Sequence, residues 1–191
     1  MKCFNCEEFA LLGFCDKCKE NLKELSLSIR MLDKNFKVYS FYKYEQIKHL
    51  LYSKHHFYGY FVFNMLAKLS FKKFKHFFNP DIKINAIALD DKVENLLYSH
   101  SAILLRYLKS KNIKPVYGAL HAQSNVKYSG QNMQFRQQNK RNYKLLKKIN
   151  HPVILVDDVV TSGSSLLEAK ELLEKNKIFV LFALVLADAK E

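Results

Sequence analysis

Hydrophobic and polar positions follow two different periods along this chain of 191 residues. Apolar residues recurring every three or four positions predict helices over residues 20–32, 46–52, 58–69, 97–108 and 164–175, and a short helical piece over 143–149. Short apolar or alternating runs predict strands over residues 38–44, 82–89, 115–120, 153–156 and 178–186. Beyond residue 80, strands and helices alternate, which is typical of βαβ units around a parallel sheet. The pattern therefore predicts an α/β fold.

Two stretches differ from this regular pattern. Residues 127–138 are polar and follow no period, which predicts a mobile loop. Between Phe36 and Phe78 lie 15 of the 26 aromatic residues of the chain. Rings interleaved with lysines can form a stacking platform for single-stranded nucleic acid, whereas rings at helical spacing usually form a core. We favour the core interpretation.

Composition excludes several classes of protein. Hydrophobic residues make up 49% of the chain, so it can bury a core and is not expected to be disordered. No apolar run reaches the roughly 18–20 residues that a membrane-spanning helix needs, and the N-terminus lacks the apolar centre of a signal peptide. We therefore expect a soluble cytoplasmic protein, for which peripheral association with a membrane stays open.

Charge is distributed unevenly along the chain. It carries 31 Lys and Arg against 18 Asp and Glu, a formal net charge of +13. Residues 95–156 contain 11 basic residues and no acid, and residues 46–80 contain six lysines and no acid. Codon bias would add lysines without removing acids over such lengths. The distribution favours a surface that faces a polyanion, and we take DNA as the partner.

All four cysteines lie within the first 18 residues. Cys3, Cys6, Cys15 and Cys18 follow the spacing C-x2-C-x8-C-x2-C. Two residues between paired cysteines let a tight turn aim both thiolates at one ion, and four such ligands complete a tetrahedral Zn²⁺ shell. Disulfides are disfavoured in the reducing compartment expected here, and iron is the other alternative. The spacing therefore predicts a structural zinc ribbon over residues 1–20.

The segment from Val153 to Ser165, VILVDDVVTSGSS, carries the most specific signal. Four apolar residues predict a buried strand that ends in Asp157 and Asp158, and small hydroxylated residues around Gly163 then open a helix. The backbone amides of residues 161–165 and the helix N-terminus can form a nest for a phosphate. Because carboxylates accept hydrogen bonds from vicinal hydroxyls, the segment suits a ligand with both a phosphate and a diol.

This segment resembles the phosphoribosyl pyrophosphate (PRPP) motif of type I phosphoribosyltransferases, with Ser162 in place of a threonine. The resemblance implies that the two aspartates hold the ribose hydroxyls, that residues 161–165 hold the 5′-phosphate, and that Mg²⁺ bridges hydroxyls and pyrophosphate. The PRPP-binding residues so implied are Asp157, Asp158, Val159, Val160, Thr161, Ser162, Gly163, Ser164 and Ser165. The implied fold is a type I phosphoribosyltransferase-like parallel sheet flanked by helices, over residues 81–191.

A second resemblance covers nearly the whole chain. The cysteine ribbon, an aromatic strand followed by residues 47–54, and the C-terminal motif together resemble the ComF (ComFC) family of competence proteins. Residues 21–80 then correspond to a hood-like helical and aromatic segment. Arg136 and Asn139 resemble the family's Arg-x-x-Asn element after a flexible loop, and residues 90–92 fall at its pyrophosphate loop. The arginine and glycine that many members carry after the first core strand are absent, because residues 95–100 read NLLYSH.

Two functions follow from these resemblances. The first is a competence protein of natural transformation (DNA uptake) that binds single-stranded DNA and a phosphoribosyl ligand such as PRPP, with other DNA-uptake proteins as further partners. The second is an active phosphoribosyltransferase that transfers ribose-5-phosphate from PRPP to a nitrogen nucleophile. We favour the first, and catalytic activity and catalytic residues stay open. Of the seven histidines only His100 is expected near the site, with packing as its favoured role.

Overall fold

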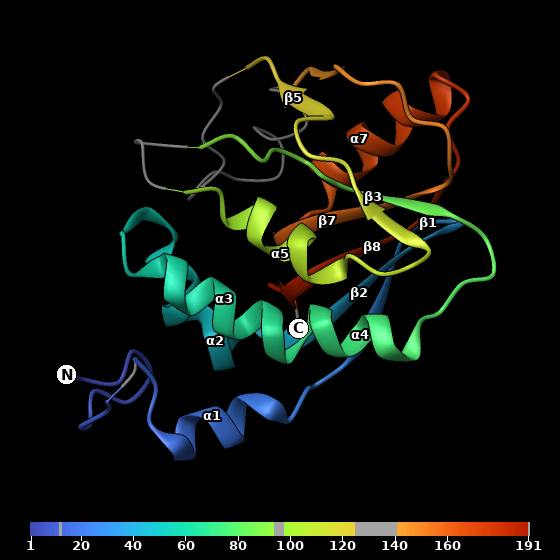
Figure 1. Cartoon of the computed structure of the whole chain (residues 1–191). Coiled ribbons are helices and arrows are strands. Elements are labelled where there is room, and N and C mark those ends of the chain that lie inside the picture. Colours follow the sequence, from blue (N-terminus) through green and yellow to red (C-terminus); the bar gives the residue numbers. More distant parts are fainter. Residues whose placement is uncertain (12, 94–97, 125–140, 191) are drawn as a thin grey trace.

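A six-stranded sheet runs through the centre of the protein. The computed structural model describes residues 1–11, 13–93, 98–124 and 141–190. The strands of the central sheet are β1 (Ser28–Asp33), β2 (Phe36–Lys43), β3 (Ile84–Ala88), β4 (Ile113–Pro115), β7 (Val153–Val160) and β8 (Val180–Asp188). Their order across the sheet is β1-β2-β8-β7-β3-β4, and all neighbours are parallel except β1, which pairs antiparallel with β2 (Figure 1).

Helices cover one face of this sheet, and one helix with a small second sheet covers the other (Figure 1). The helical layer consists of α2 (Tyr44–Leu51), the 3-10 turn η1 (Tyr52–His55), α3 (Gly59–Leu69), α4 (Phe71–Phe77) and α5 (His100–Leu108), with α1 (Asp16–Lys23) beneath it. The opposite face carries α7 (Ser164–Lys175) and the two antiparallel strands β5 (Leu120–Ala122) and β6 (Tyr143–Leu145).

The sheet separates two apolar cores. Along β7, Leu155 packs into the cluster that includes Leu166 and Leu173 of α7, whereas Val156 packs into the cluster that includes Leu104 of α5. Successive side chains of a strand point to opposite faces, so a central strand covered on both faces reads as a continuous apolar run. This is why β7 and β8 are the most apolar segments of the sequence.

The N-terminal cysteine segment belongs to the helical layer's core. Cys3, Phe14 and Cys18 are buried in the same cluster as the apolar faces of α2 and α3. The ring of Phe4 stacks on Tyr58, with ring centroids 5.3 Å apart and planes 18° from parallel. The ribbon is therefore packed against the helices and does not stand apart as a separate body.

Most predicted elements are present, and the predicted α/β class with a mostly parallel sheet is confirmed. Helix α7 spans the residues predicted for it, and α2, α3 and α5 begin and end within three residues of the predicted bounds. Strand β7 is longer than predicted, because it continues through both aspartates to Val160. Helix α4 was missed, since its apolar positions are interrupted by lysines. The loop predicted over residues 127–138, with Arg136, lies outside the described residues.

The helix predicted over residues 20–32 is wrong. Helix α1 ends at Lys23, and residues 28–33 form β1 at the sheet edge. The spacing of Leu22, Leu25 and Ile29 fits a helix, yet Ile29 is 61% exposed whereas Leu22 is buried. Pairing of β1 with the edge of β2 supplies backbone hydrogen bonds that local periodicity does not reveal.

Two shorter predictions after residue 110 are also wrong. The strand predicted over residues 115–120 is broken, because Gly118 has a φ of +58° and separates β4 from β5. The helical piece predicted over residues 143–149 is instead β6, which pairs with β5 from Leu120↔Leu145 to Ala122↔Tyr143. This pairing joins segments that flank residues 125–140, so its signal is not local in sequence.

Candidate functional site

The four cysteines converge as the sequence predicts. Their sulfur atoms all lie within 4.8 Å of one another, and the Sγ atoms of Cys6 and Cys15 are 3.7 Å apart. A tetrahedral Zn²⁺ with Zn–S bonds of about 2.3 Å places its sulfurs roughly 3.8 Å apart. The four thiols therefore fit a closed zinc shell with no position left for a substrate.

Hydrogen bonds around the sulfurs favour their thiolate forms. The backbone N–H of Cys15 donates to Cys3 Sγ at 3.3 Å, and Asn5 Nδ2 donates to Cys18 Sγ at 3.2 Å. Although burial opposes ionisation, backbone donors lower the pKa of Cys3 to about 6. Burial raises the pKa of Cys18 to about 12, and neighbouring sulfurs oppose its ionisation too. A bound cation is therefore needed for all four to ionise together.

The diacid lies at the carboxyl end of the parallel strand β7, where open α/β sheets bind ligands. The carboxylate Oδ2 of Asp158 is 2.9 Å from Lys54 Nζ in η1 and 3.8 Å from His100 Nε2 at the start of α5. Although burial alone would raise it, Lys54 and His100 hold the pKa of Asp158 well below its usual range. Burial and the neighbouring Asp158 carboxylate raise the pKa of Asp157 to about 7. Asp158 is thus ionised near neutral pH, whereas Asp157 is only partly ionised.

The loop after β7 opens helix α7 in the predicted manner. Gly163 has a φ of +84° and precedes the first helical residue, Ser164. The hydroxyls of Ser162 and Ser164 are 2.9 Å apart, and Ser164 N–H donates to Ser162 Oγ at 3.3 Å. This tight turn places backbone amides and hydroxyls together at the N-terminus of a 12-residue helix, the arrangement that binds phosphate.

Three residues at the site were missed by sequence reasoning or given another role. Lys54 was read only as part of an acid-free stretch, and His100 as a packing residue. Arg30 falls within the segment wrongly predicted as a helix, yet its Nη2 donates to the Thr161 carbonyl at 2.8 Å. No local motif marks these residues, because tertiary folding alone brings them to β7.

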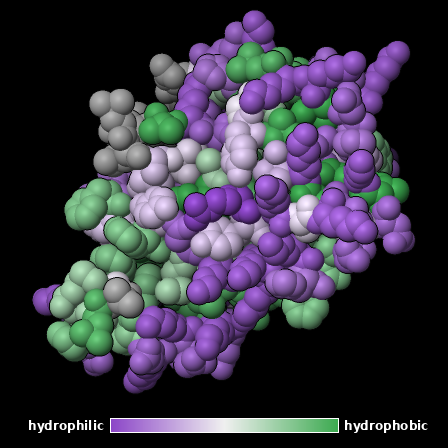
Figure 2. Space-filling model, viewed as in Figure 1, coloured by the Kyte–Doolittle hydropathy of each residue, from purple (hydrophilic) through white to green (hydrophobic). Residues whose placement is uncertain are grey.

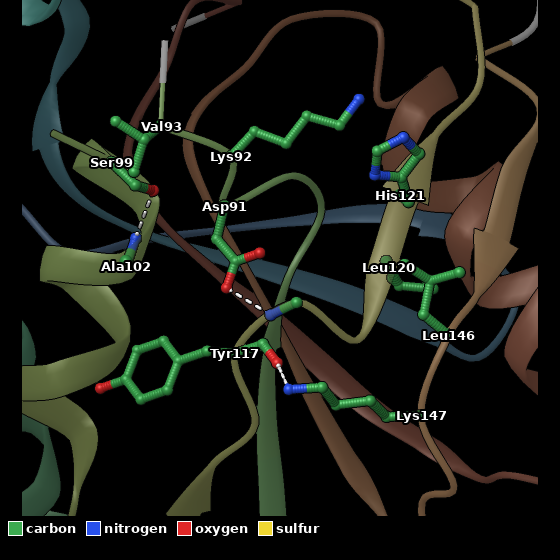
Figure 3. Close-up of a pocket in the computed structure, with 11 residues that line it drawn as sticks. Asp91, Lys92, Val93, Ser99, Ala102, Tyr117, Leu120, His121, Leu146 and Lys147 are labelled. Carbon is green, nitrogen blue, oxygen red and sulfur yellow. Dashed lines mark hydrogen bonds between the residues drawn. The ribbon is translucent and has the colours of Figure 1, made fainter. Parts of the chain in front are cut away.

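A cavity of about 470 Å³ lies beside the diacid strand, at the ends of β3 and β4 (Figure 3). Asp91 accepts a hydrogen bond from Gly118 N–H at 2.7 Å, and burial raises its pKa. Lys92 and Lys147 line the cavity, but each donates to a backbone carbonyl, of Ala122 and Tyr117 respectively. Residues 90–92 follow β3, the strand next to β7, and their role as a pyrophosphate loop stays a prediction. Asp157 and Asp158 do not line the cavity.

Comparison with known proteins identifies the C-terminal part of the chain. Residues 104–191 match the family model described as the phosphoribosyl transferase domain. The match covers β7, its diacid, the loop and α7, and leaves Arg30, Lys54 and the cysteines outside. A comparison with curated proteins found no match. The protein thus carries a phosphoribosyltransferase-type domain together with a cysteine cluster able to bind zinc. Within the described ranges, no helix is long and apolar enough to cross a membrane.

Removal of zinc tests the metal centre. Because the ribbon shares its core with α2 and α3, we expect about one Zn²⁺ per chain and a melting temperature lower by several degrees after chelation. Cys6 is exposed, so Cys6→Ser removes a ligand without removing core packing. Metal analysis and thermal melts of this variant should match the chelated protein, and Glu8→Ser is the control in the same ribbon. Equal melting of metal-loaded and chelated protein would contradict the assignment.

The raised pKa of Asp157 gives a pH-dependent contribution to stability. The folded state holds this proton more tightly than the unfolded state, so the contribution is complete below about pH 4 and is lost as pH rises through about 7. Asp157→Asn should therefore gain stability relative to the natural protein, by on the order of 1 kcal/mol between pH 6 and 8. Chemical denaturation at both pH values measures this, with the exposed Asp81→Asn as control. If the difference in the free energy of unfolding between Asp157→Asn and the natural protein stays constant with pH, the raised pKa of Asp157 is refuted.

Proposed function

We propose that this is a cytoplasmic competence protein of the ComF type, which binds PRPP and single-stranded DNA during natural transformation. The proposed binding of PRPP is supported by the position of the segment from Val153 to Ser165 in the fold. Its diacid and phosphate loop lie together at the carboxyl end of a central parallel strand, within a phosphoribosyltransferase-type domain.

The site offers a partner for each polar part of PRPP. Asp157 and Asp158 accept from the ribose hydroxyls, and the amides and hydroxyls of residues 161–165 hold the 5′-phosphate, with Val159 and Val160 as the spacer. The carboxylates at the ends of β3 and β7 are oxygen donors of the kind Mg²⁺ prefers, and the ion would offset pyrophosphate charge beside Asp90 and Asp91. Arg136, which lies outside the described residues, is proposed as a further contact.

Turnover is the alternative function. In a phosphoribosyltransferase, a nitrogen nucleophile attacks the anomeric carbon, the bond to pyrophosphate breaks, and positive charge develops on the ribose ring. Ionised Asp158 supplies negative charge near that ring, but its ion pair with Lys54 offsets it. We therefore favour ligand binding, and pyrophosphate release from PRPP with a panel of nitrogen acceptors separates the two functions.

Calorimetric titration with Mg²⁺ and PRPP tests the phosphoribosyl site. The natural protein should bind, and Asp158→Asn should lose about tenfold or more in affinity, because a charged acceptor of the hydroxyls is removed. This variant leaves Lys54 without its partner at Asp158, so Lys54→Met/Asp158→Asn serves as a second variant that removes both charges. Asp81→Asn is the control. Absence of PRPP binding by the natural protein would refute the proposal.

Exposed aromatic residues support the DNA part of the proposal. The prediction that the rings of residues 36–78 form a core holds for Phe41 and Phe63, which are buried, but fails for a group around η1. Phe57 is 71% exposed and Phe61 is 58% exposed. Figure 2 shows apolar surface gathered over the ribbon and the start of α3, where this group lies. Exposed rings are costly in water and are suited to stacking with unpaired bases.

The exposed rings belong to a segment of the chain without acids and lie near the phosphoribosyl site. No acid occurs in residues 46–80, which contain six lysines. Tyr60 contacts Phe61 and Tyr98 at centroid distances of 5.6 and 6.0 Å, and the Tyr98 hydroxyl donates to the carbonyl of Lys54. Lys54 in turn contacts Asp158. A single strand lying on these rings would therefore pass beside the bound phosphoribosyl ligand.

Binding of an oligothymidylate measured by fluorescence anisotropy tests this surface. Affinity should fall as salt rises from 50 to 200 mM, because phosphate contacts release counterions. Phe57→Ala with Phe61→Ala should weaken binding by about tenfold or more, since each stacked base contributes about 1–3 kcal/mol. Phe77→Ala is a matched control, because Phe77 is 88% exposed but lies on α4. Equal affinity of the double variant and this control would show that the exposed rings are not the binding surface for single-stranded DNA.

A further inference from the structure

The phosphate loop, residues 161–165 after β7, is in contact with β1, although β1 and β7 are not neighbours in the sheet. Strand order places β2 and β8 between β1 and β7. Neighbouring strands are about 4.8 Å apart, so the axes of β1 and β7 lie roughly 14 Å apart. Two side chains of β1, Arg30 and Leu32, nevertheless reach the loop. They share one face of the strand, because they are two positions apart.

Arg30 joins the loop to the end of β8. Its Nη2 donates to the carbonyl oxygen of Thr161 at 2.8 Å, and its Nε lies 2.9 Å from Asp188 Oδ2. Asp188 is 1% exposed, and the contact between these two charges is an ion pair without the alignment of a hydrogen bond. The guanidinium is thus fixed by a buried carboxylate while it holds the first residue of the loop.

Holding this carbonyl also sets the direction of an amide. The carbonyl of Thr161 and the N–H of Ser162 belong to one planar trans peptide unit, in which they point in opposite directions. When Arg30 binds the carbonyl on the β1 side, the Ser162 N–H faces away from β1. Among the described residues, no hydrogen bond is recorded from the N–H of Ser162 or Gly163. Both amides therefore keep a donor that a ligand could use.

Leu32 fixes the next residue of the loop. A Cβ added to Gly163 would lie 2.5 Å from Leu32 Cδ2, so the side chain of Leu32 packs directly on this glycine. Gly163 is thus required twice, once for its positive φ and once for the close approach of β1. Together the two side chains hold the backbone of residues 161–163 from the side of β1.

We propose that Arg30 is a positioning residue of the phosphate site, which orients the loop amides toward the phosphate monoester of a sugar phosphate, with Leu32 as its packing partner. The inference rests on the proposed function, because it takes the 5′-phosphate to lie on this loop. It adds a segment outside residues 104–191 to the phosphate site. Arg30 acts through the Thr161 carbonyl and needs no contact with the ligand.

Titration of the full-length, zinc-loaded protein with Mg²⁺ and PRPP, and separately with ribose 5-phosphate and inorganic pyrophosphate, tests the inference. Arg30→Gln should bind PRPP and ribose 5-phosphate about tenfold more weakly, by the same factor for both, because both carry the 5′-phosphate. Its affinity for pyrophosphate should be unchanged. Hydrogen–deuterium exchange of the peptide covering residues 157–167 should be faster in this variant without ligand. Arg106→Gln, on α5, is the control for loss of an arginine.

Loss of Arg30 removes the ion-pair partner of the buried Asp188 and could by itself destabilise the fold. A second variant separates such destabilisation from an effect on binding. Arg30→Met/Asp188→Asn removes both charges and should melt like the natural protein while keeping the weak binding. Natural affinity for ribose 5-phosphate in this double variant would overturn the inference and leave the proposed function standing. Failure of the natural protein to bind either sugar phosphate would instead refute the proposed function, and the inference with it.

Discussion

Two adjacent carboxyl groups at the buried end of β7 do not readily ionise together, so a cation beside one of them favours ionisation of that one. Lys54 supplies that cation from the helical layer, and the surrounding structure fixes its backbone. The Tyr98 hydroxyl lies within hydrogen-bonding distance of the carbonyl oxygens of Ser53 and Lys54, and a Cβ on Gly59 would overlap the Ser53 carbonyl oxygen. The charge at the end of β7 is thus met by a lysine whose backbone is held in place between α2 and α3.

The N-terminal half completes the site in more than one place. Arg30 approaches the loop from β1, while Lys54 approaches the diacid from η1. The cysteine ribbon is held against the same layer, because Asn5 contacts both Cys18 Sγ and His49 Nε2 of α2. The segment that matches the phosphoribosyl transferase model supplies the motif, and the remainder of the chain supplies the cations and the amide orientation around it.

The sequence predicted the structure correctly wherever the signal lay within a short stretch of consecutive residues. The cysteine spacing predicted the four-sulfur cluster, and the apolar run before Asp157 predicted a central strand followed by α7. Edge pairing was not predictable in this way, since β1 and β6 take their structure from strands distant in sequence. Arg30 was missed together with β1, and the pairing of the buried Asp158 with Lys54 could not be predicted, because the two residues are about a hundred positions apart. Exposure was misjudged at Phe57 and Phe61, because helical spacing of rings does not say which face is covered.

The pairing of β2 with β8 has a consequence for how the protein is made. Val38 lies opposite Ala183, so 145 positions, about three quarters of the chain, separate these two neighbouring strands of the central sheet. During synthesis the hairpin of β1 and β2 has no parallel partner strand until β8, residues 180–188, has been made. Such non-local pairing folds slowly and exposes an open strand edge in the meantime. The nascent chain is therefore a more demanding substrate for chaperones than its modest length suggests.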